Sequence, residues 1–135
     1  MLLDTTTYSV KRQPAVTDTK PTLAELAVAA DFTKKSFTDY EGTVKGEENA
    51  SFTENYKTDG TTDTKTTYYY HTATSELALA ASANADSYMT KTVTIRGTDA
   101  ANLKQVAFYT GSEKGEEQIA WSKDYNYNGT SVKTV

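Results

Sequence analysis

The sequence IAWSKDYNYNGTSV, residues 119–132, carries the clearest structural signal in the chain. Alternate residues of this stretch would share one face of a β-strand, and they are Ile119, Trp121, Lys123, Tyr125 and Tyr127. The dipeptide Asn128-Gly129 is preferred by two-residue type I′ turns, which would place Tyr127 opposite Thr130 and Tyr125 opposite Val132. Because the alternation and the turn signal are independent and agree, the stretch predicts an antiparallel hairpin whose aromatic face is interior.

Short alternating runs separated by Gly, Asp and Asn continue over most of the chain. They predict seven strands, at Ser36–Lys45, Ala50–Lys57, Thr64–Thr74, Tyr88–Arg96, Lys104–Thr110, Glu117–Tyr127 and Thr130–Val135. Strands of this length and spacing are typical of an antiparallel sandwich or barrel, so we expect a mostly β fold of about seven strands with one or two short helices. An α+β sheet is the alternative. No internal repeat is evident from the sequence.

Residues 21–135 are expected to form a single β-rich domain, preceded by an N-terminal arm or edge strand at residues 1–20. The arm contains one strand-like piece, Thr6–Gln13, whose apolar anchors are Tyr8 and Val10. After Pro21, the Thr22-Leu-Ala-Glu25 spacing of a capping box predicts a helix over Thr22–Asp31. The alanine-rich stretch Ser75–Ala85 predicts either a second short helix or an ordered loop.

Composition favours strands and a thin core. Threonine is the most frequent residue, and its β-branched side chain suits a pleated surface. Leu, Ile, Val and Phe together fall below the roughly 20% at which disorder becomes a concern, but the net charge is only −4 and ten Tyr with one Trp supply large apolar faces. We therefore expect an aromatic-rich, marginal core that a partner surface completes.

The run Tyr68-Tyr69-Tyr70 places aromatic rings on both faces of one strand, because successive side chains alternate. Both faces then need cover, from a second layer of the same chain or from another subunit. The candidate interaction residues are accordingly Tyr8, Val10, Tyr68, Tyr69 and Tyr70. Tyr8 and Val10 belong to the arm, which suits addition to another subunit's sheet edge.

No catalytic, cofactor or metal site is predicted. His71 is the only histidine and is predicted to be a strand residue at a sheet surface. The chain has no cysteine, so catalytic triads and His/Cys metal sites lack their members. Asp124–Gly129 matches the first half of a calcium loop, but Val135 stands where the bidentate Glu belongs. The pairs Glu47-Glu48 and Glu116-Glu117 are predicted to be solvated loop charges.

Charge and hydropathy restrict the kinds of partner that the chain is expected to bind. An acidic chain repels a phosphate backbone, which argues against nucleic acid, and no segment approaches the roughly 18 apolar residues of a membrane span. The first residues lack the pattern of a signal peptide, so we expect synthesis in a host cytoplasm without export.

These properties together favour a non-catalytic, self-assembling structural protein over an enzyme. The specific expectation is a subunit of a virus-like particle, such as a phage coat, decoration or tail-tube protein. Its partners would be copies of itself, and other virion proteins could join them. Its location would be the virion. The alternative is an adhesin-like or ligand-binding β-domain that recognises a protein surface or carbohydrate, with Trp121, Tyr125 and Tyr127 as a stacking platform.

Overall fold

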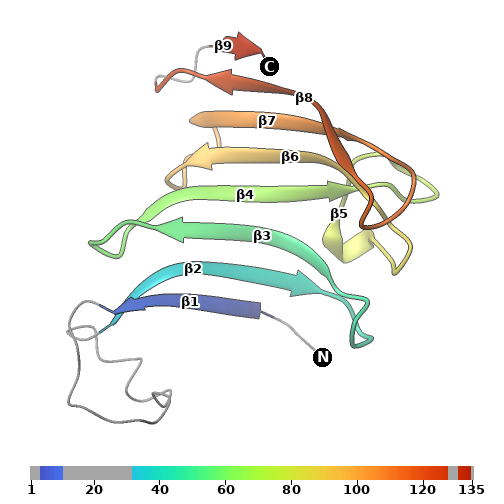
Figure 1. The fold of residues 1–135 in the computed structure, drawn as a ribbon, viewed down its shortest axis with the longest axis horizontal. Helices are drawn as coiled ribbons and strands as arrows, with labels where there is room; N and C mark the ends of the chain where they lie inside the picture. Colours follow the sequence, from blue (N-terminus) through green and yellow to red (C-terminus); the bar gives the residue numbers. More distant parts are fainter. Residues whose placement is uncertain (1–3, 11–31, 128–130, 135) are drawn as a thin grey trace.

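The fold is an antiparallel β-meander in a single sheet (Figure 1). The computed structural model describes residues 4–10, 32–127 and 131–134. The strands are β1 (Asp4–Val10), β2 (Phe32–Glu41), β3 (Asn49–Tyr56), β4 (Thr62–Tyr70), β5 (Ala78–Leu79), β6 (Met89–Arg96), β7 (Leu103–Thr110), β8 (Gln118–Tyr125) and β9 (Ser131–Thr134). Their order across the sheet is β1-β2-β3-β4-β6-β7-β8-β9, and the short β5 pairs with β4.

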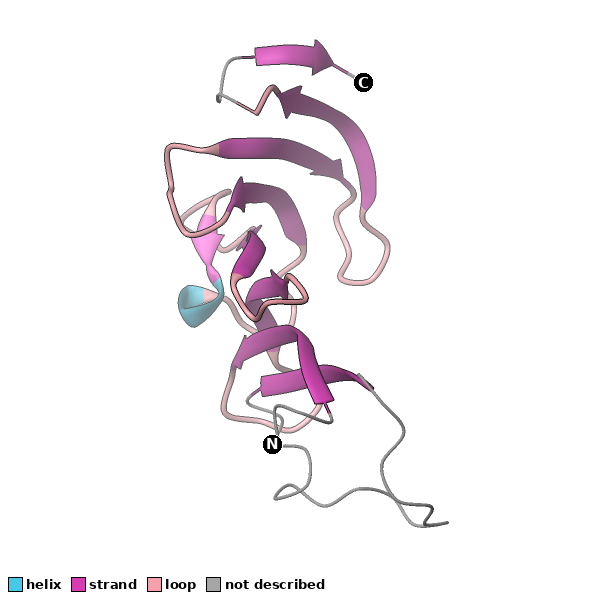
Figure 2. Cartoon of the chain, turned by 90° about the vertical axis from the view of Figure 1, so that its left-hand side faces the viewer, coloured by secondary structure: helices cyan, strands magenta, loops and turns pink. Residues whose placement is uncertain are grey.

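The mostly β, antiparallel class predicted from the sequence is confirmed. The sheet is not closed into a barrel, since β1 and β9 lie at its two opposite edges. Seen from the side, the described strands follow one another in one twisted layer (Figure 2). Packing between the described strands is therefore lateral, from each strand to its neighbours in the sheet.

Each of the seven predicted strands is present, with shifted ends. The strand predicted at Ser36–Lys45 is β2, which begins at Phe32 and ends at Glu41. Gly42 then turns the chain with a φ of 148°. The strand predicted at Thr64–Thr74 is β4, which ends at Tyr70 because the Thr72 hydroxyl accepts the backbone N–H of Ser75 and forms a local turn. The strand-like piece of the arm forms β1, at Asp4–Val10, which pairs with β2 of its own chain.

The alanine-rich stretch forms an ordered connection, with β5 and the 3₁₀ turn η1 (Ala80–Ser82). The Ser75 hydroxyl accepts the backbone N–H of Leu77, a local bond that closes a turn. Ala78 and Ala80 are buried, which only small side chains permit so close to the sheet. The predicted helix over Thr22–Asp31 and the Asn128-Gly129 turn lie outside the described residues.

The C-terminal hairpin forms in a different register from the predicted one. Tyr125 pairs with Ser131, not with Val132, because a bulge shifts the register between Asp124 and Tyr125. The predicted pairing of Tyr125 with Val132 is therefore wrong. A period-two pattern fixes which side chains share a face but not where an extra residue enters the ladder.

Side-chain alternation gives the sheet two chemically different faces. The threonine face comprises Ser36, Thr38, Thr53, Asn55, Thr64, Thr66, Tyr68, Tyr70, Thr92, Thr94, Arg96, Gln105, Ala107, Ser122 and Asp124. The aromatic face comprises Phe37, Phe52, Tyr56, Tyr69, Val93, Ile95, Val106, Phe108, Trp121 and Tyr125, with Lys34, Lys65, Lys91 and Lys123 among them. The polar positions in between are Asp4, Thr6, Asp39, Glu54 and Thr67.

Burial is confined to small residues and one tyrosine. Among the described residues the buried apolar side chains are Tyr70, Ala78, Ala80 and Ala107, and the buried polar ones include Thr64, Thr92 and Ser122. No large side chain of the described part is fully buried. The sheet is thus held by its ladders and cross-strand pairs rather than by a two-layer core, and the expected aromatic interior is not formed within the described chain.

Candidate functional site

The residues tested for chemistry lie apart or are already engaged. His71 follows β4 rather than lying within a strand, and its ring stacks on Tyr88 at 4.6 Å between centroids. Its Nδ1 is 2.7 Å from Oε1 of the exposed Glu76. Among the described residues no three His, Cys, Asp or Glu side chains come together as metal ligands. This corner of the fold is a surface contact between two loops.

The segment that half-matches a calcium loop is bound through its backbone by an arginine side chain. Arg96 donates hydrogen bonds to the backbone carbonyl oxygens of Tyr125 (2.8 Å) and Asn126 (3.0 Å), and also to that of Leu103 (2.6 Å). The Asp124 carboxylate accepts a hydrogen bond from the Gln105 amide at 2.9 Å. Arg96 binds backbone carbonyls and Gln105 engages the Asp124 carboxylate, so the described part of this segment serves as a structural crosslink from β6 to the end of β8.

The acidic pairs are not all solvated charges, contrary to expectation. Glu117 is partly buried: its Oε1 accepts the backbone N–H of Met89 (2.9 Å) and its Oε2 that of Gly115 (2.8 Å). Partial burial alone would raise the pKa of this carboxyl, but the backbone donors and the nearby Lys114 outweigh it and lower the pKa. Glu48 likewise accepts the backbone N–H of Gly46 at 2.7 Å. The second Glu of each pair therefore clamps its loop.

The three consecutive tyrosines divide between the two faces, as predicted. Tyr68 and Tyr70 lie on the threonine face, where their hydroxyls donate to Thr53 Oγ1 (3.0 Å) and to the Ala50 carbonyl (2.7 Å). Tyr70 is buried, and burial raises its pKa well above the usual value. Tyr69 lies on the aromatic face with the Lys91 ammonium 5.6 Å from its ring. The chain's own strands thus engage Tyr68 and Tyr70, which leaves Tyr69 as the outward-facing member.

The other two candidate residues lie on the edge strand. Tyr8 is exposed on β1 and pairs with Lys34. The backbone of Val10 pairs with Phe32. Within the described residues β1 pairs on one side only, with β2, so its outer edge is open.

Lysines and aromatic rings interleave across the aromatic face. The Lys65 ammonium lies 4.0 Å from the Phe52 ring centroid, and Lys91 lies 5.4 Å from that of Phe108. Phe108 in turn stacks on Trp121 with centroids 4.5 Å apart. Lys65 and Lys91 are partly exposed, and the Lys65 ammonium also lies 3.8 Å from Glu54 Oε1. A lysine that covers a ring with its charge and alkyl stem lowers the cost of an aromatic surface without a second layer.

Trp121 is 43% exposed and Ile119 is 61% exposed, so the prediction of an interior Ile119–Trp121–Tyr125 face is wrong. These residues also do not share one face. Trp121 pairs with Phe108 but Ile119 pairs with Tyr109, the next residue of β7, because a bulge intervenes between them. Tyr127 lies beyond the strand with its ring 5.3 Å from the Arg96 guanidinium, so it does not extend a platform of Trp121 and Tyr125.

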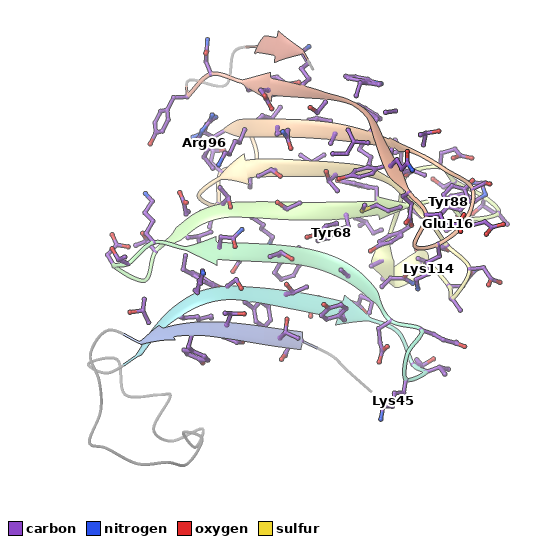
Figure 3. The ribbon with its side chains drawn as sticks, in the orientation of Figure 1. Lys45, Tyr68, Tyr88, Arg96, Lys114 and Glu116 are labelled. Atoms are coloured by element: carbon purple, nitrogen blue, oxygen red, sulfur yellow. The ribbon has the colours of Figure 1, made fainter. Side chains whose placement is uncertain are left out.

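On the threonine face, hydroxyls bond to one another across strands. Thr38 and Thr53 join through their Oγ1 atoms at 2.9 Å, and Thr66 and Thr94 at 2.8 Å. Beside them is a shallow polar hollow of about 510 Å³, lined in part by Asn55, Arg96, Gln105 and Asp124. Arg96 marks this end of the sheet, and the loops carrying Lys45 and Lys114 mark the other (Figure 3).

Of the interleaved lysines, only Lys123 was placed on the aromatic face from the sequence. Their signal is local: Lys65, Lys91 and Lys123 each stand two residues from an aromatic or β-branched residue on the same strand.

Comparison of the chain with protein-family models, curated proteins and solved structures gave no match. No helix in the described part of the chain is long and apolar enough to cross a membrane.

Proposed function

We propose that this chain is a non-catalytic structural subunit that assembles with copies of itself, and that its aromatic face is the contact. The observation that carries the proposal is a single-layer sheet with Trp121 43% exposed and stacked on Phe108. A β-sheet with one apolar face normally buries that face against a second layer. A second copy supplies such a layer and completes a two-sheet sandwich.

Charge favours a second copy over an unrelated apolar surface. On β6, β7 and β8, the described residues of the aromatic face include Lys91 and Lys123 and no acidic side chain. On β1 and β2 the same face carries two carboxylates, Asp4 and Asp39, against one lysine, Lys34, so this end of the face has a net negative charge. Two copies packed face to face in opposite directions bring the basic part of each against the acidic part of the other, which fixes their orientation.

The assembly would be a shell or tube of a virus-like particle, the form that a small, threonine- and tyrosine-rich β-subunit without a catalytic cluster suits. Its location would then be the virion. Electron micrographs of the concentrated protein should show regular particles or tubes, and unstructured aggregates alone would contradict this specific form.

Trp121 is the only tryptophan, so its fluorescence reports on the proposed contact. In dilute, monomeric solution iodide should quench its emission, and as sedimentation shows association at higher concentration the emission should shift to shorter wavelength and resist iodide. Association without any change at Trp121 would contradict the aromatic contact. A chain that stays monomeric at 14.8 kDa at all concentrations would contradict self-assembly.

A charge-swap series tests the orientation. Lys91→Glu with Lys123→Glu should weaken association, and Asp39→Lys in addition should restore part of it, because opposite charges again face each other. Lys45→Glu with Lys114→Glu makes the same change of charge in the exposed β2–β3 and β7–β8 loops and should leave association unchanged. Loss of association without rescue would contradict the antiparallel arrangement.

The second candidate is a carbohydrate-binding module, favoured by the polar hollow beside Gln105 and Asp124. Hydroxyl, amide and carboxylate groups at one hollow suit the hydroxyls of a sugar. Titration with oligosaccharides, followed by calorimetry and compared with a Gln105→Ala variant, would detect it. Heat of binding that the variant abolishes would favour this function over assembly.

A further inference from the structure

Two loops of the chain are copies of one motif. GTVKGEE at residues 42–48 joins β2 to β3, and GSEKGEE at residues 111–117 joins β7 to β8. Gly46 and Gly115 have φ values of 88° and 90°. Each donates its backbone N–H to the Glu two residues later, at 2.7 Å and 2.8 Å. The loops therefore match in conformation as well as in sequence.

The match extends through the flanking strands. Every cross-strand pair of β7 with β8 has a counterpart 69 residues earlier in β2 with β3; Phe108↔Trp121, for example, corresponds to Asp39↔Phe52. The register shifts recur as well: the one between Phe108 and Tyr109 corresponds to the one between Asp39 and Tyr40. The pairs of β8 with β9 likewise repeat those of β3 with β4.

The first strand of each half follows the same rule. β6 pairs with β7 as β1 pairs with β2, and both ladders shift register at the same place, between Thr94 and Ile95 and between Thr7 and Tyr8. The chain is therefore a duplicated four-stranded meander, β1–β4 and β6–β9, joined by residues 71–88. The expectation of no internal repeat is wrong: the strands repeat a ladder without repeating their residues, and the two loops at residues 42–48 and 111–117 carry the repeat in sequence.

The duplication shows how one meander joins the next. β4, the last strand of the first meander, pairs antiparallel with β6, the first strand of the second. By the same correspondence, β9 is the counterpart of the first part of β4, Thr62–Lys65, and β1 is the counterpart of β6. The two edges of the sheet are thus the two sides of a junction that the molecule already contains.

We propose that copies of this chain join edge to edge, β9 of one copy pairing with β1 of the next in the register of the β4–β6 junction. The inference rests on the proposed self-assembly and names a second contact for it. β1 is suited to accept a strand, because Asp4–Val10 contains none of the Lys, Arg or Pro residues that commonly protect an exposed edge. A head-to-tail contact of this kind does not close on itself, so it extends the sheet into a filament or a lattice row.

The register is specific enough to test by disulfide trapping. Lys65 pairs with Ile95 at the internal junction, and the corresponding pair between copies is Thr134 with Tyr8. Directly paired residues of antiparallel strands lie about 4.5–5.5 Å apart at Cα, within the range a disulfide spans. The chain has no cysteine, so introduced thiols have no competitors.

Two single variants, Tyr8→Cys and Thr134→Cys, are mixed under mild oxidation and read on a non-reducing gel. The expected product is a crosslinked dimer that neither variant forms alone. Thr7→Cys mixed with Thr134→Cys is the matched control, because a shift of one residue points the thiol to the opposite face, and its yield should be at least several-fold lower. Lys65→Cys with Ile95→Cys in one chain should close an internal bridge and shows that the chemistry works at this spacing.

Equal yields from the Tyr8 and Thr7 variants, or no dimer while the internal bridge forms, would overturn the edge contact. These results are separable from the proposed function. Association with Trp121 protection but without the dimer leaves the aromatic contact standing and removes the edge contact. Formation of the crosslinked dimer while iodide still quenches Trp121 supports the edge contact and removes the aromatic contact.

Discussion

The Thr66–Thr94 hydroxyl pair gives a quantitative test of how this sheet is stabilised. Their Oγ1 atoms lie 2.8 Å apart across β4 and β6, partly shielded from solvent. Replacing one threonine with valine keeps the shape but leaves the other hydroxyl without this partner. Because an unsatisfied, partly buried hydroxyl costs more than the net worth of the bond, each single variant should be destabilised by about 1 kcal/mol.

The double variant Thr66→Val with Thr94→Val should lose no more than either single variant, because both polar groups leave together. The coupling energy of the double-mutant cycle is then about 1 kcal/mol. Thr53 and Thr66 provide the control, since they are paired across β3 and β4 but their hydroxyls bond to other residues. Their coupling should stay below about 0.5 kcal/mol.

Urea unfolding followed by circular dichroism measures both cycles. With a slope of about 1–3 kcal/mol/M, a difference of 1 kcal/mol moves the midpoint by several tenths molar or more, which is readily resolved. Equal coupling in the two cycles, or additivity in the Thr66–Thr94 cycle, would refute the assignment of stability to the hydroxyl pairs.

Three further predictions concern the loops and the end of the sheet. Because the pKa of Glu117 is lowered in the folded protein, its carboxylate stabilises the fold above the unfolded pKa, and this contribution is lost as the pH falls through the folded pKa. Glu117→Gln should therefore lower Tm at pH 7, with a difference that shrinks as the pH falls below the unfolded pKa, and a pH-independent difference would contradict the clamp. Gly46→Ala and Gly115→Ala should each cost about 1 kcal/mol, since both impose a positive φ on a residue with a Cβ, and clearly unequal losses in thermal melts would argue against equivalent loops. Arg96→Lys should destabilise by roughly 2 kcal/mol in urea unfolding, because a single ammonium cannot serve the carbonyls of both Leu103 and Tyr125 as the planar fork does, and wild-type stability would show that the fork is dispensable.

The sequence alone was sufficient to predict the fold class. Alternation of side chains is a property of neighbouring residues, so it located all seven predicted strands and placed the rings of Tyr68 and Tyr69 on opposite faces. The Gly-containing loops were found for the same reason, since a positive φ is a local requirement that leaves its mark in composition.

The site depended on the pairing between strands, which no local pattern contains. A bulge in β8 separates Ile119 from Trp121, although the alternation puts them together. A contact with the backbone of Met89, distant in sequence, distinguishes Glu117 from an ordinary loop charge. The sequence marks the duplication only in the loops GTVKGEE and GSEKGEE, at residues 42–48 and 111–117. The single layer of the described strands and the repeated register were decided by tertiary structure, because register depends on where extra residues enter and identical ladders form from different side chains.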